Sequence, residues 1–323
     1  MRVPDFWNHD GVLPHLLAPL GAVYAAATAR RVACPGWRAP VPVLCAGNAG
    51  VGGAGKTTVA LDLGARLLAR GARVAFLTRG YGGRGGAGRV DPARHDASAV
   101  GDEALLLAAL APTYVGADRA LSARAALADG ADALVMDDGL QNPTLHKDFS
   151  VLVIDGEVGF GNGRPIPAGP LREPVAACAV RCRAAVLIGA DRTLARAALP
   201  PDLPVLTARL EPAPDILAVA GRRVLAFAGI GRPEKFFDML ADAGIEIVAR
   251  HPFADHHRYT DAEFFAVLAE ADRLGAVPVT TPKDAARLTP AQLARVRVVG
   301  VRLAWDSLAA VTTLLDDALA GRR

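Results

Sequence analysis

The first two thirds of the chain alternate between short apolar runs and segments whose apolar residues recur at helical spacing. A short apolar run bounded by glycine or polar residues is typical of a buried strand, and a spacing of three and four residues is typical of a helix. The strands predicted in this way are residues 40–47, 72–80, 112–116, 132–139, 149–156 and 183–189. The helices predicted between them are residues 56–71, 101–110 and 118–130. This alternation predicts an α/β fold in which a parallel sheet carries helices on both faces.

The pattern changes around residues 211–224, where prolines, charges and apolar residues mix without a clear period. Four further strand candidates follow, with helical segments between them: residues 223–230, 244–253, 276–284 and 296–303. We therefore predict three parts, which are an N-terminal helix in residues 1–35, a large domain in residues 36–213 and a smaller α/β lobe in residues 214–323. Two long loops, residues 79–103 and 156–174, interrupt the large domain, and loops of this length usually carry function.

Residues 11–29 form an uncharged segment about as long as a membrane-spanning helix. A secretory signal is disfavoured, because the first ten residues contain two acids and a tryptophan instead of a basic stretch. A spanning helix would have to accommodate Pro14 and Pro19. Two interpretations stay open on these residues alone: an ordinary core helix, and a helix that lies in the membrane interface with aromatic residues and arginines near its ends.

Composition narrows the range of partners. The chain has 323 residues, a net charge of +3 and 52% hydrophobic residues, enough for a sizeable core. Its basic residues are scattered rather than clustered, so no nucleic-acid partner is predicted. Separately, we expect a monomer. The four cysteines form no C-x-x-C pair, and we expect free buried thiols in a reducing compartment. They are Cys34, Cys45, Cys178 and Cys182.

The segment GNAGVGGAGKTT, residues 47–58, fits the phosphate-loop template and lies between a predicted strand and a predicted helix. Glycines let backbone N–H groups turn inward toward the phosphates, while a lysine neutralises phosphate charge and a threonine hydroxyl serves Mg²⁺. The pattern therefore predicts a site for a nucleoside triphosphate with Mg²⁺. The residues predicted to form it are Gly50, Gly52, Gly53, Gly55, Lys56, Thr57 and Thr58.

Transfer of the terminal phosphoryl group requires acidic residues on the metal side and a base for the acceptor hydroxyl. Asp137 and Asp138 follow a predicted strand and are candidates for the metal side, although strand-end acids also cap turns. Asp102 and Glu103 open a predicted helix, and a histidine pair that includes His256 lies in the second lobe. An aspartate and a histidine brought together across a cleft would form such a base, and a polar surface loop is the alternative for the histidines.

Seven segments together resemble the signatures of the tetraacyldisaccharide 4'-kinases, in the same order and over nearly the whole chain. They are the phosphate loop, TRGYGG (78–83), VGDEALLL (100–107), DDGLQN (137–142), IPAGPLRE (166–173), FADHHRY (253–259) and TPKDAARL (281–288). The start, FWNHDGVLPHLLAPLGAVY, is similar to the family's N-terminal membrane-associated helix. The resemblance implies a P-loop kinase that transfers the γ-phosphoryl group of ATP to the 4′-hydroxyl of a tetraacyldisaccharide 1-phosphate. It also implies lipid A biosynthesis at the cytoplasmic face of the bacterial inner membrane, with a lipid substrate and a membrane surface as partners.

The same resemblance implies roles for individual residues. Asp102 would act as the base, paired with His256, and Lys56 would hold the phosphates. The residues implied around Mg²⁺ are Thr57, Glu103, Asp138 and Gln141. The residues implied on the substrate side are Tyr81, Arg119, Arg172 and Asp137. Two positions depart from the family pattern, since Asn142 and Pro282 stand where many relatives have His and Glu.

A phosphate-loop nucleotide switch, a GTPase or ATPase that assists metal insertion or assembly, is the alternative function. Guanine specificity usually requires Asn-Lys-x-Asp at a strand end, whereas Lys283 and Asp284 are adjacent here. A soluble small-molecule kinase is a further alternative. Neither alternative accounts for the apolar N-terminal segment.

Overall fold

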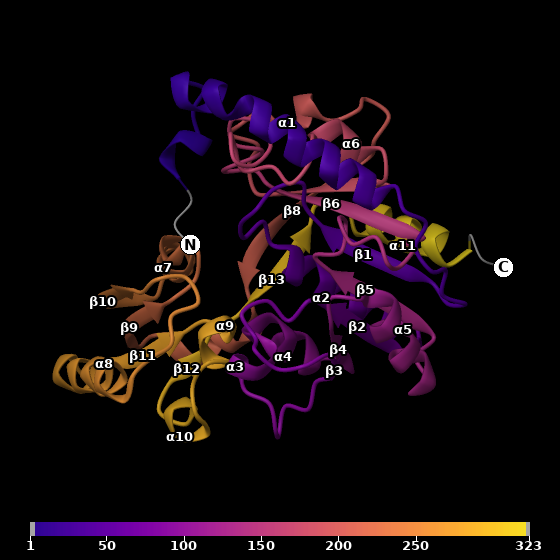
Figure 1. Cartoon of the computed structure of the whole chain (residues 1–323). Coiled ribbons are helices and arrows are strands. Elements are labelled where there is room, and N and C mark those ends of the chain that lie inside the picture. Colours follow the sequence, from indigo (N-terminus) through magenta and orange to yellow (C-terminus); the bar gives the residue numbers. More distant parts are fainter. Residues whose placement is uncertain (1–3, 321–323) are drawn as a thin grey trace.

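The computed structural model describes residues 4–320, and its largest feature is a nine-stranded sheet (Figure 1). The strands from one edge to the other are β13 (Val301–Trp305), β8 (Val205–Pro212), β7 (Ala184–Ile188), β6 (Phe149–Asp155), β1 (Val43–Gly47), β5 (Ala133–Asp137), β2 (Val74–Thr78), β4 (Thr113–Val115) and β3 (Gly88–Arg89). All neighbouring strands from β8 to β4 pair in parallel, and only the two edge strands run antiparallel. The predicted parallel α/β sheet is therefore confirmed.

Helices cover both faces of this sheet, because the side chains of each central strand alternate between two apolar cores. In β1, Leu44 and Ala46 join one core, and Val43 and Cys45 join the other. The helices packed on the first face are α2 (Lys56–Ala69), α4 (Asp102–Ala108) and α11 (Leu308–Ala320). Those on the second face are α5 (Arg119–Ala128), α6 (Val175–Ala179) and the 3₁₀ helix η2 (Ala195–Ala198).

The α2 helix is central to the site, and a close contact fixes its distance from the sheet. It buries Val59, Leu63 and Leu67 on one stripe, as the apolar spacing predicts. A Cβ atom added to Gly64 would lie 2.3 Å from the ring of Phe76 in β2, so a larger residue there would push the helix away from the sheet. The start of α2 is thereby held against the strand ends that carry the acidic residues.

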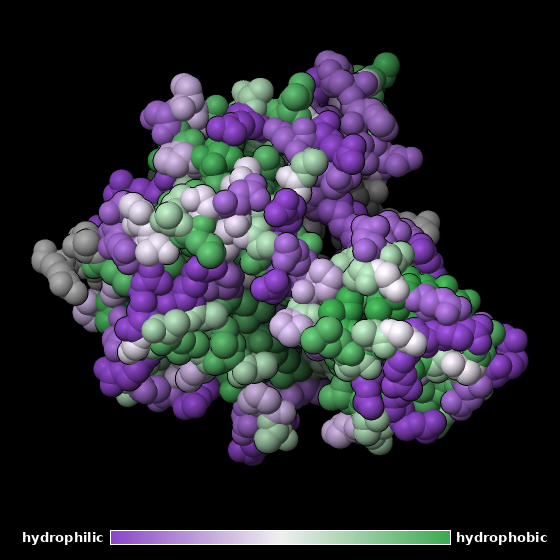
Figure 2. Space-filling view, turned by 180° about the vertical axis from the view of Figure 1, so that it is seen from behind, coloured by the Kyte–Doolittle hydropathy of each residue, from purple (hydrophilic) through white to green (hydrophobic). Residues whose placement is uncertain are grey.

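A second, four-stranded parallel sheet forms the smaller lobe. Its strands in order are β10 (Glu246–Pro252), β9 (Arg223–Ala228), β11 (Val277–Thr280) and β12 (Arg297–Val298). The helix α7 (Pro233–Asp242) packs on one face and α8 (Asp261–Leu274) on the other. Three short helices complete this part: η3 (Pro214–Val219), α9 (Pro282–Ala285) and α10 (Pro290–Leu293). From behind, the smaller lobe is a distinct bulge beside the large lobe (Figure 2).

The end of the chain returns to the large sheet, which differs from the expected lobe of residues 214–323. The run 296–303, predicted as one strand, breaks at Gly300, whose N–H donates to Asp215 at 3.1 Å. The residues before the break pair with β11, whereas β13 pairs with β8 and α11 joins the large core. The smaller lobe thus ends before Val301, because Leu303 and Trp305 are buried under α2 rather than in the small sheet.

The N-terminal segment forms η1 (Asp5–Trp7) and the long helix α1 (Val12–Val32), which lies along the large lobe (Figure 1). Only Pro14, Gly21 and Thr28 of α1 are buried, a single narrow stripe, so the core-helix interpretation is wrong. A Cβ atom on Gly21 would lie 2.9 Å from the backbone oxygen of Pro165, so this stripe contacts the long loop 156–174 closely. The exposed apolar residues of the helix are Val12, Leu13, Leu16, Leu20 and Val23.

The four cysteines are free thiols. Three are buried, as predicted, but Cys34 is exposed just beyond the end of α1. Within residues 4–320, no group of three or more His, Cys, Asp or Glu side chains is arranged to hold a metal ion.

Candidate active site

The phosphate loop joins β1 to α2, in the strand–loop–helix context that the motif requires. Gly52 and Gly55 adopt φ angles of 116° and 85°, in the region that favours glycine. A Cβ atom on Gly55 would also lie 2.7 Å from Cδ1 of Ile188. Lys56 begins α2, and its Nζ donates to the backbone oxygen of Gly52 at 3.0 Å. The loop is thus closed on itself at a helix N-terminus, the place where backbone N–H groups bind phosphate.

Loop 156–174 supports the phosphate loop from the side. The N–H of Val51 donates to the oxygen of Pro170 at 2.9 Å, and the N–H of Arg172 donates to the oxygen of Ala49 at 2.7 Å. These backbone bonds place the Arg172 side chain beside the phosphate loop. The segment that carries the IPAGPLRE motif is therefore part of the site.

Asp137, the last residue of β5, contacts the first turn of α2. Its Oδ2 accepts a hydrogen bond from Thr57 Oγ1 at 3.0 Å, and both side chains are buried. Its other oxygen, Oδ1, is buried with no hydrogen-bond partner among the described residues. Burial, followed by the negative charges of Glu103 and Asp138, raises the pKa of Asp137 to about 7. Asp137 thus presents an unsatisfied oxygen beside the threonine hydroxyl.

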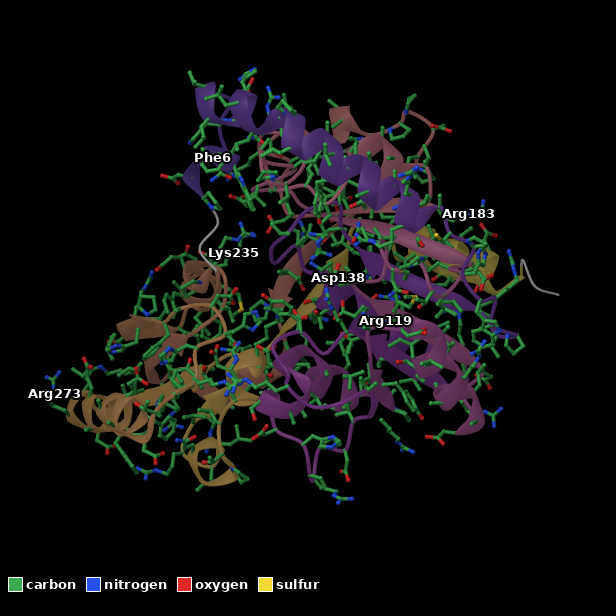
Figure 3. The ribbon with its side chains drawn as sticks, in the orientation of Figure 1. Phe6, Arg119, Asp138, Arg183, Lys235 and Arg273 are labelled. Atoms are coloured by element: carbon green, nitrogen blue, oxygen red, sulfur yellow. The ribbon has the colours of Figure 1, made fainter. Side chains whose placement is uncertain are left out.

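Asp138 faces a different set of partners. Arg172 binds both of its carboxylate oxygens, at 2.8 and 2.9 Å, and Lys56 Nζ lies 3.9 Å away. Burial raises the pKa of Asp138, but the charges of Lys56 and Arg172 outweigh it and leave the pKa below its usual value. Its φ angle of 52° turns the backbone sharply after the strand. Asp138 lies near the centre of the molecule (Figure 3).

Gln141, expected near the metal, takes part in a hydrogen-bond network behind Arg172. Its Nε2 donates to the oxygen of Asn48 at 2.9 Å and to Glu173 Oε1 at 2.8 Å, while its Oε1 accepts from Arg172 at 3.3 Å. Glu173 is buried and binds Arg181 through both oxygens. In this arrangement Gln141 orients Arg172.

The two other residues expected on the substrate side differ in access. Arg119 is only 2% exposed, donates to the oxygen of Gly116 and lies inside the large lobe near Asp138 (Figure 3). Burial lowers its pKa to about 10, a value at which it keeps its charge at neutral pH. Tyr81 is 62% exposed, and its ring centroid lies 5.7 Å from that of His256. Tyr81 is therefore accessible to a ligand, whereas Arg119 is enclosed by the large lobe and interacts electrostatically with Asp138.

The two lobes meet at Asp102. Its Oδ2 lies 3.1 Å from His256 Nδ1 and accepts from Arg287 Nη2 at 2.6 Å, and both partners come from the smaller lobe. Its Oδ1 accepts the N–H of Glu103 at 2.9 Å. Next to it, Lys283 Nζ donates to Glu103 Oε1 at 2.7 Å. The structure thus brings together the aspartate and histidine predicted as a base, although they are 154 positions apart in the chain.

The charges around Asp102 keep it ionised. Burial raises its pKa, but the hydrogen bond from His256 and the charges of Arg287 and Lys283 hold the pKa below its usual range. In return, the hydrogen bond to Asp102 raises the pKa of His256. His256 has a φ angle of 57°, so two non-glycine residues in the left-handed region, Asp138 and His256, lie at this site.

Arg287, Lys283 and Glu173 lie in quoted motifs, but the sequence alone gave them no role in the site. Arg287 is almost fully buried and also binds Asp284 at 3.1 Å. The available signal was the four-residue spacing of Lys283 and Arg287, which places both on one face of a helical turn. The spacing could not predict their acidic partners, because Glu103 and Asp102 lie on the other lobe.

Mg²⁺ fits the residues at the end of β5. Magnesium in phosphate-loop proteins takes a threonine hydroxyl and one or two carboxylates, with water and phosphate oxygens completing the shell. Thr57 and the unsatisfied Oδ1 of Asp137 supply this donor set. Glu103, whose charge acts on Asp137, is a further oxygen donor close by.

Replacing Asp137 with Asn is expected to raise the unfolding temperature at pH 8 by roughly 2–5 °C in protein without nucleotide or Mg²⁺. An acid whose pKa is about 7 in the fold binds more protons when folded than when unfolded. Its contribution to stability therefore falls as the pH rises from about 4 through 7. Asn removes the charge and keeps an acceptor for Thr57. Thermal unfolding of both proteins from pH 5 to pH 8 tests this. If the difference in unfolding temperature between Asp137→Asn and the wild type does not grow with pH, the prediction is contradicted.

Known proteins match this chain over nearly its whole length. The family model described as tetraacyldisaccharide-1-P 4'-kinase matches residues 13–320. Proteins named tetraacyldisaccharide 4'-kinase share 60% identity over 319 residues in Gluconacetobacter diazotrophicus, with 98% of both chains covered, and 53% over 328 residues in Rhodospirillum rubrum, with 100% of this chain and 99% of the relative covered. The crystal structure of LpxK from Aquifex aeolicus in complex with ATP matches with a TM-score of 0.74 and 25% identity, covering 95% of this chain and 100% of its own. The chain therefore belongs to the tetraacyldisaccharide-1-P 4'-kinase family.

Proposed function

We propose that this chain transfers the γ-phosphoryl group of ATP to the 4′-hydroxyl of a tetraacyldisaccharide 1-phosphate, using Asp102 as the base. The bond between the γ-phosphorus and its bridging oxygen breaks, the bond to the 4′-oxygen forms, and ADP leaves with the bridging oxygen. The observation that carries the proposal is the Asp102–His256 contact, which joins the lobes next to Glu103, whose charge acts on Asp137. As a member of this family the chain is an ATP-dependent kinase of lipid A biosynthesis, and the nucleotide-switch alternative is not favoured.

The proton of the acceptor hydroxyl goes to Asp102. This carboxylate is ionised, because His256 and Arg287 both bind its Oδ2. His256 holds the carboxylate in place and, once the proton has been taken up, stabilises the pair through Nδ1. Arg287 is buried and always charged, so it keeps the base in its ionised form between turnovers.

The phosphate loop and the end of β5 hold the nucleotide. Lys56 is placed to move from the oxygen of Gly52 to the β- and γ-phosphates. Bound Mg²⁺ would neutralise charge on these phosphates, held by Thr57, Asp137 and Glu103. Asp138 was first expected at the metal and Asp137 on the substrate side. We propose the opposite, because Arg172 binds both carboxylate oxygens of Asp138. With Gln141 and Glu173 behind it, Arg172 is positioned to contact an anionic group of either substrate.

The α1 helix provides the contact with the lipid-bearing membrane. It is long and apolar enough to cross a membrane, and apolar side chains cover its exposed side. Arg30 and Arg31 lie exposed in its last turn, where they would meet anionic headgroups. We place the helix in the interface rather than across the bilayer, because its buried stripe packs on loop 156–174 of the same chain. We infer the cytoplasmic face, where ATP is available, and we expect a monomer.

A triple variant, Leu16→Glu, Leu20→Glu and Val23→Glu, is expected to lower binding to anionic lipid vesicles by roughly tenfold or more. These residues are 71%, 58% and 68% exposed and lie on one side of α1, so the change removes apolar contact without disturbing the core. Sedimentation with vesicles measures the bound fraction. Leu217→Glu, at a residue 74% exposed on η3, is the matched control. Equal binding by the triple variant and the wild type contradicts the assignment.

ADP production with and without lipid acceptor tests the function. We expect ADP release to depend on tetraacyldisaccharide 1-phosphate, with one phosphorylated lipid formed for each ADP, because closure around Asp102 excludes water as a competing acceptor. A nucleotide switch would release ADP, or GDP from GTP, at the same rate without the lipid. That result would overturn the proposed function.

A further inference from the structure

Lys283 is a cation that the smaller lobe brings into the site, and so far its charge has only been seen to help keep Asp102 ionised. It belongs to α9, and its Nζ lies 2.7 Å from Glu103 Oε1 on the large lobe. Its side chain is 32% exposed. It also interacts electrostatically with Asp102 and Asp137. Its ammonium group therefore lies among the carboxylates assigned to the base and to the metal side.

The position of Lys283 matches the path of the transferred group. At one end of that path is the phosphate loop, where Thr57 contacts Asp137. At the other end is Asp102, which takes the proton of the acceptor. A phosphoryl group that moves between these ends carries negative charge on its equatorial oxygens. An ammonium group beside both ends stabilises that charge more than the charge of the reactants.

A purely structural role in holding the lobes together does not explain the position of Lys283. The buried Asp102–Arg287 pair already joins the lobes at 2.6 Å, and Lys235 of α7 joins them again through Asp155 at 3.0 Å. A partly exposed ion pair such as Lys283–Glu103 contributes about 0–1 kcal/mol to stability. Adhesion also gives no reason for a cation to face Glu103, the carboxylate placed to serve the metal.

We propose that Lys283 is a further catalytic residue, which hydrogen-bonds an equatorial oxygen of the transferring phosphoryl group and leaves Glu103 to the metal when MgATP binds. This inference rests on the proposed function. Lys283 gives up no proton, and its ammonium group only donates hydrogen bonds while the γ-phosphorus changes its oxygen partner. Since Lys283 comes from the smaller lobe, the contact exists only while the lobes are together.

The first test compares Lys283→Met and Lys283→Arg with the wild type in the lipid phosphorylation assay. We expect kcat of Lys283→Met to fall about a hundredfold, with KM for ATP changed less than about threefold. The Lys283→Arg variant keeps the charge and should recover to within about tenfold of the wild type. Lys235→Met is the matched control, because it removes another lysine from the lobe contact, on the side facing the N-terminal segment (Figure 3). Its kcat should stay within about threefold of the wild type.

The second test measures binding of ADP with and without fluoroaluminate, a planar analogue of the transferring group, in the presence of Mg²⁺ and lipid acceptor. The wild type should bind ADP more tightly with fluoroaluminate. Lys283→Met should lose at least about tenfold of this gain, while its affinity for ADP alone and its unfolding temperature stay unchanged.

Three results would overturn the inference: an unchanged kcat in Lys283→Met, an equal loss in Lys235→Met, or a rise in KM without a fall in kcat. An intact gain from fluoroaluminate in Lys283→Met has the same consequence. Absence of lipid phosphorylation by the wild type instead counts against the proposed function, so the two failures are distinguishable.

Discussion

Replacing Asp102 with Asn is expected to lower kcat for lipid phosphorylation by about a thousandfold, within the range that general bases contribute. Asn has nearly the same shape and can still accept from His256 and Arg287, but it cannot take the proton of the acceptor hydroxyl. Its 3% exposure and its contacts with both lobes make Asp102 the residue on which the proposed chemistry depends most. KM for ATP should change little, because the phosphate loop is untouched.

The control for this variant is Asp255→Asn. Asp255 Oδ2 lies 3.8 Å from Nε2 of the same His256 ring, but its side chain is 39% exposed. We expect its kcat to stay within about threefold of the wild type. The unfolding temperature of Asp102→Asn must also be measured. In this variant Arg287 loses its buried charge partner Asp102 and keeps Asp284. An Asp102→Asn enzyme that is folded, binds ATP and retains more than about a tenth of wild-type kcat would show that Asp102 is not the base.

Replacing Lys56 with Met is expected to lower kcat/KM for ATP by at least about a hundredfold. Its ammonium group is the phosphate-loop cation, which donates to the oxygen of Gly52 and lies 3.9 Å from Asp138. The charge of the γ-phosphoryl group in transit then loses a donor placed at the helix N-terminus. The Met side chain has a similar length, so the fold of the loop should persist.

Kinetics and binding together check the Lys56 prediction. Thermal unfolding without nucleotide should be nearly unchanged, whereas the stabilisation given by MgATP should shrink. Arg70→Met serves as a control for loss of a cation from the same helix, since Arg70 follows α2 at its far end and pairs with Asp316. A Lys56→Met protein with wild-type kcat/KM would show that the loop does not hold the transferred phosphate.

Most of the large sheet could be predicted because its strands are buried on both faces. Each central strand then reads as a continuous apolar run, as β6 does from Phe149 to Asp155. The strand β8 was not predicted, because it lacks this continuous apolar run. It lies near an edge, is only partly buried and carries Arg209 and Glu211. The return of β13 to the large sheet depends on pairing with β8, and pairing between distant segments leaves no local signal.

The site could be predicted only in part. The phosphate loop has a fixed local spacing, so its residues follow from the sequence. The Asp102–His256 pair came from the family resemblance, because the spacing alone left His256 equally compatible with a surface loop. Neither the residue spacing nor the family resemblance predicted which of the two aspartates contacts Thr57 and which contacts Arg172. Alternation along β5 directs Asp137 toward Thr57, and the left-handed turn at Asp138 directs the next carboxylate toward Arg172.

The most direct test of the account is identification of the product. Purified full-length protein would be incubated in mixed micelles with MgATP and tetraacyldisaccharide 1-phosphate, and the lipid analysed by ³¹P NMR and mass spectrometry. The account predicts a lipid with a second phosphate, attached at the 4′-oxygen, formed by the wild type and nearly absent with Asp102→Asn. Unmodified lipid beside steady release of ADP, or a phosphate attached elsewhere on the lipid, would contradict it.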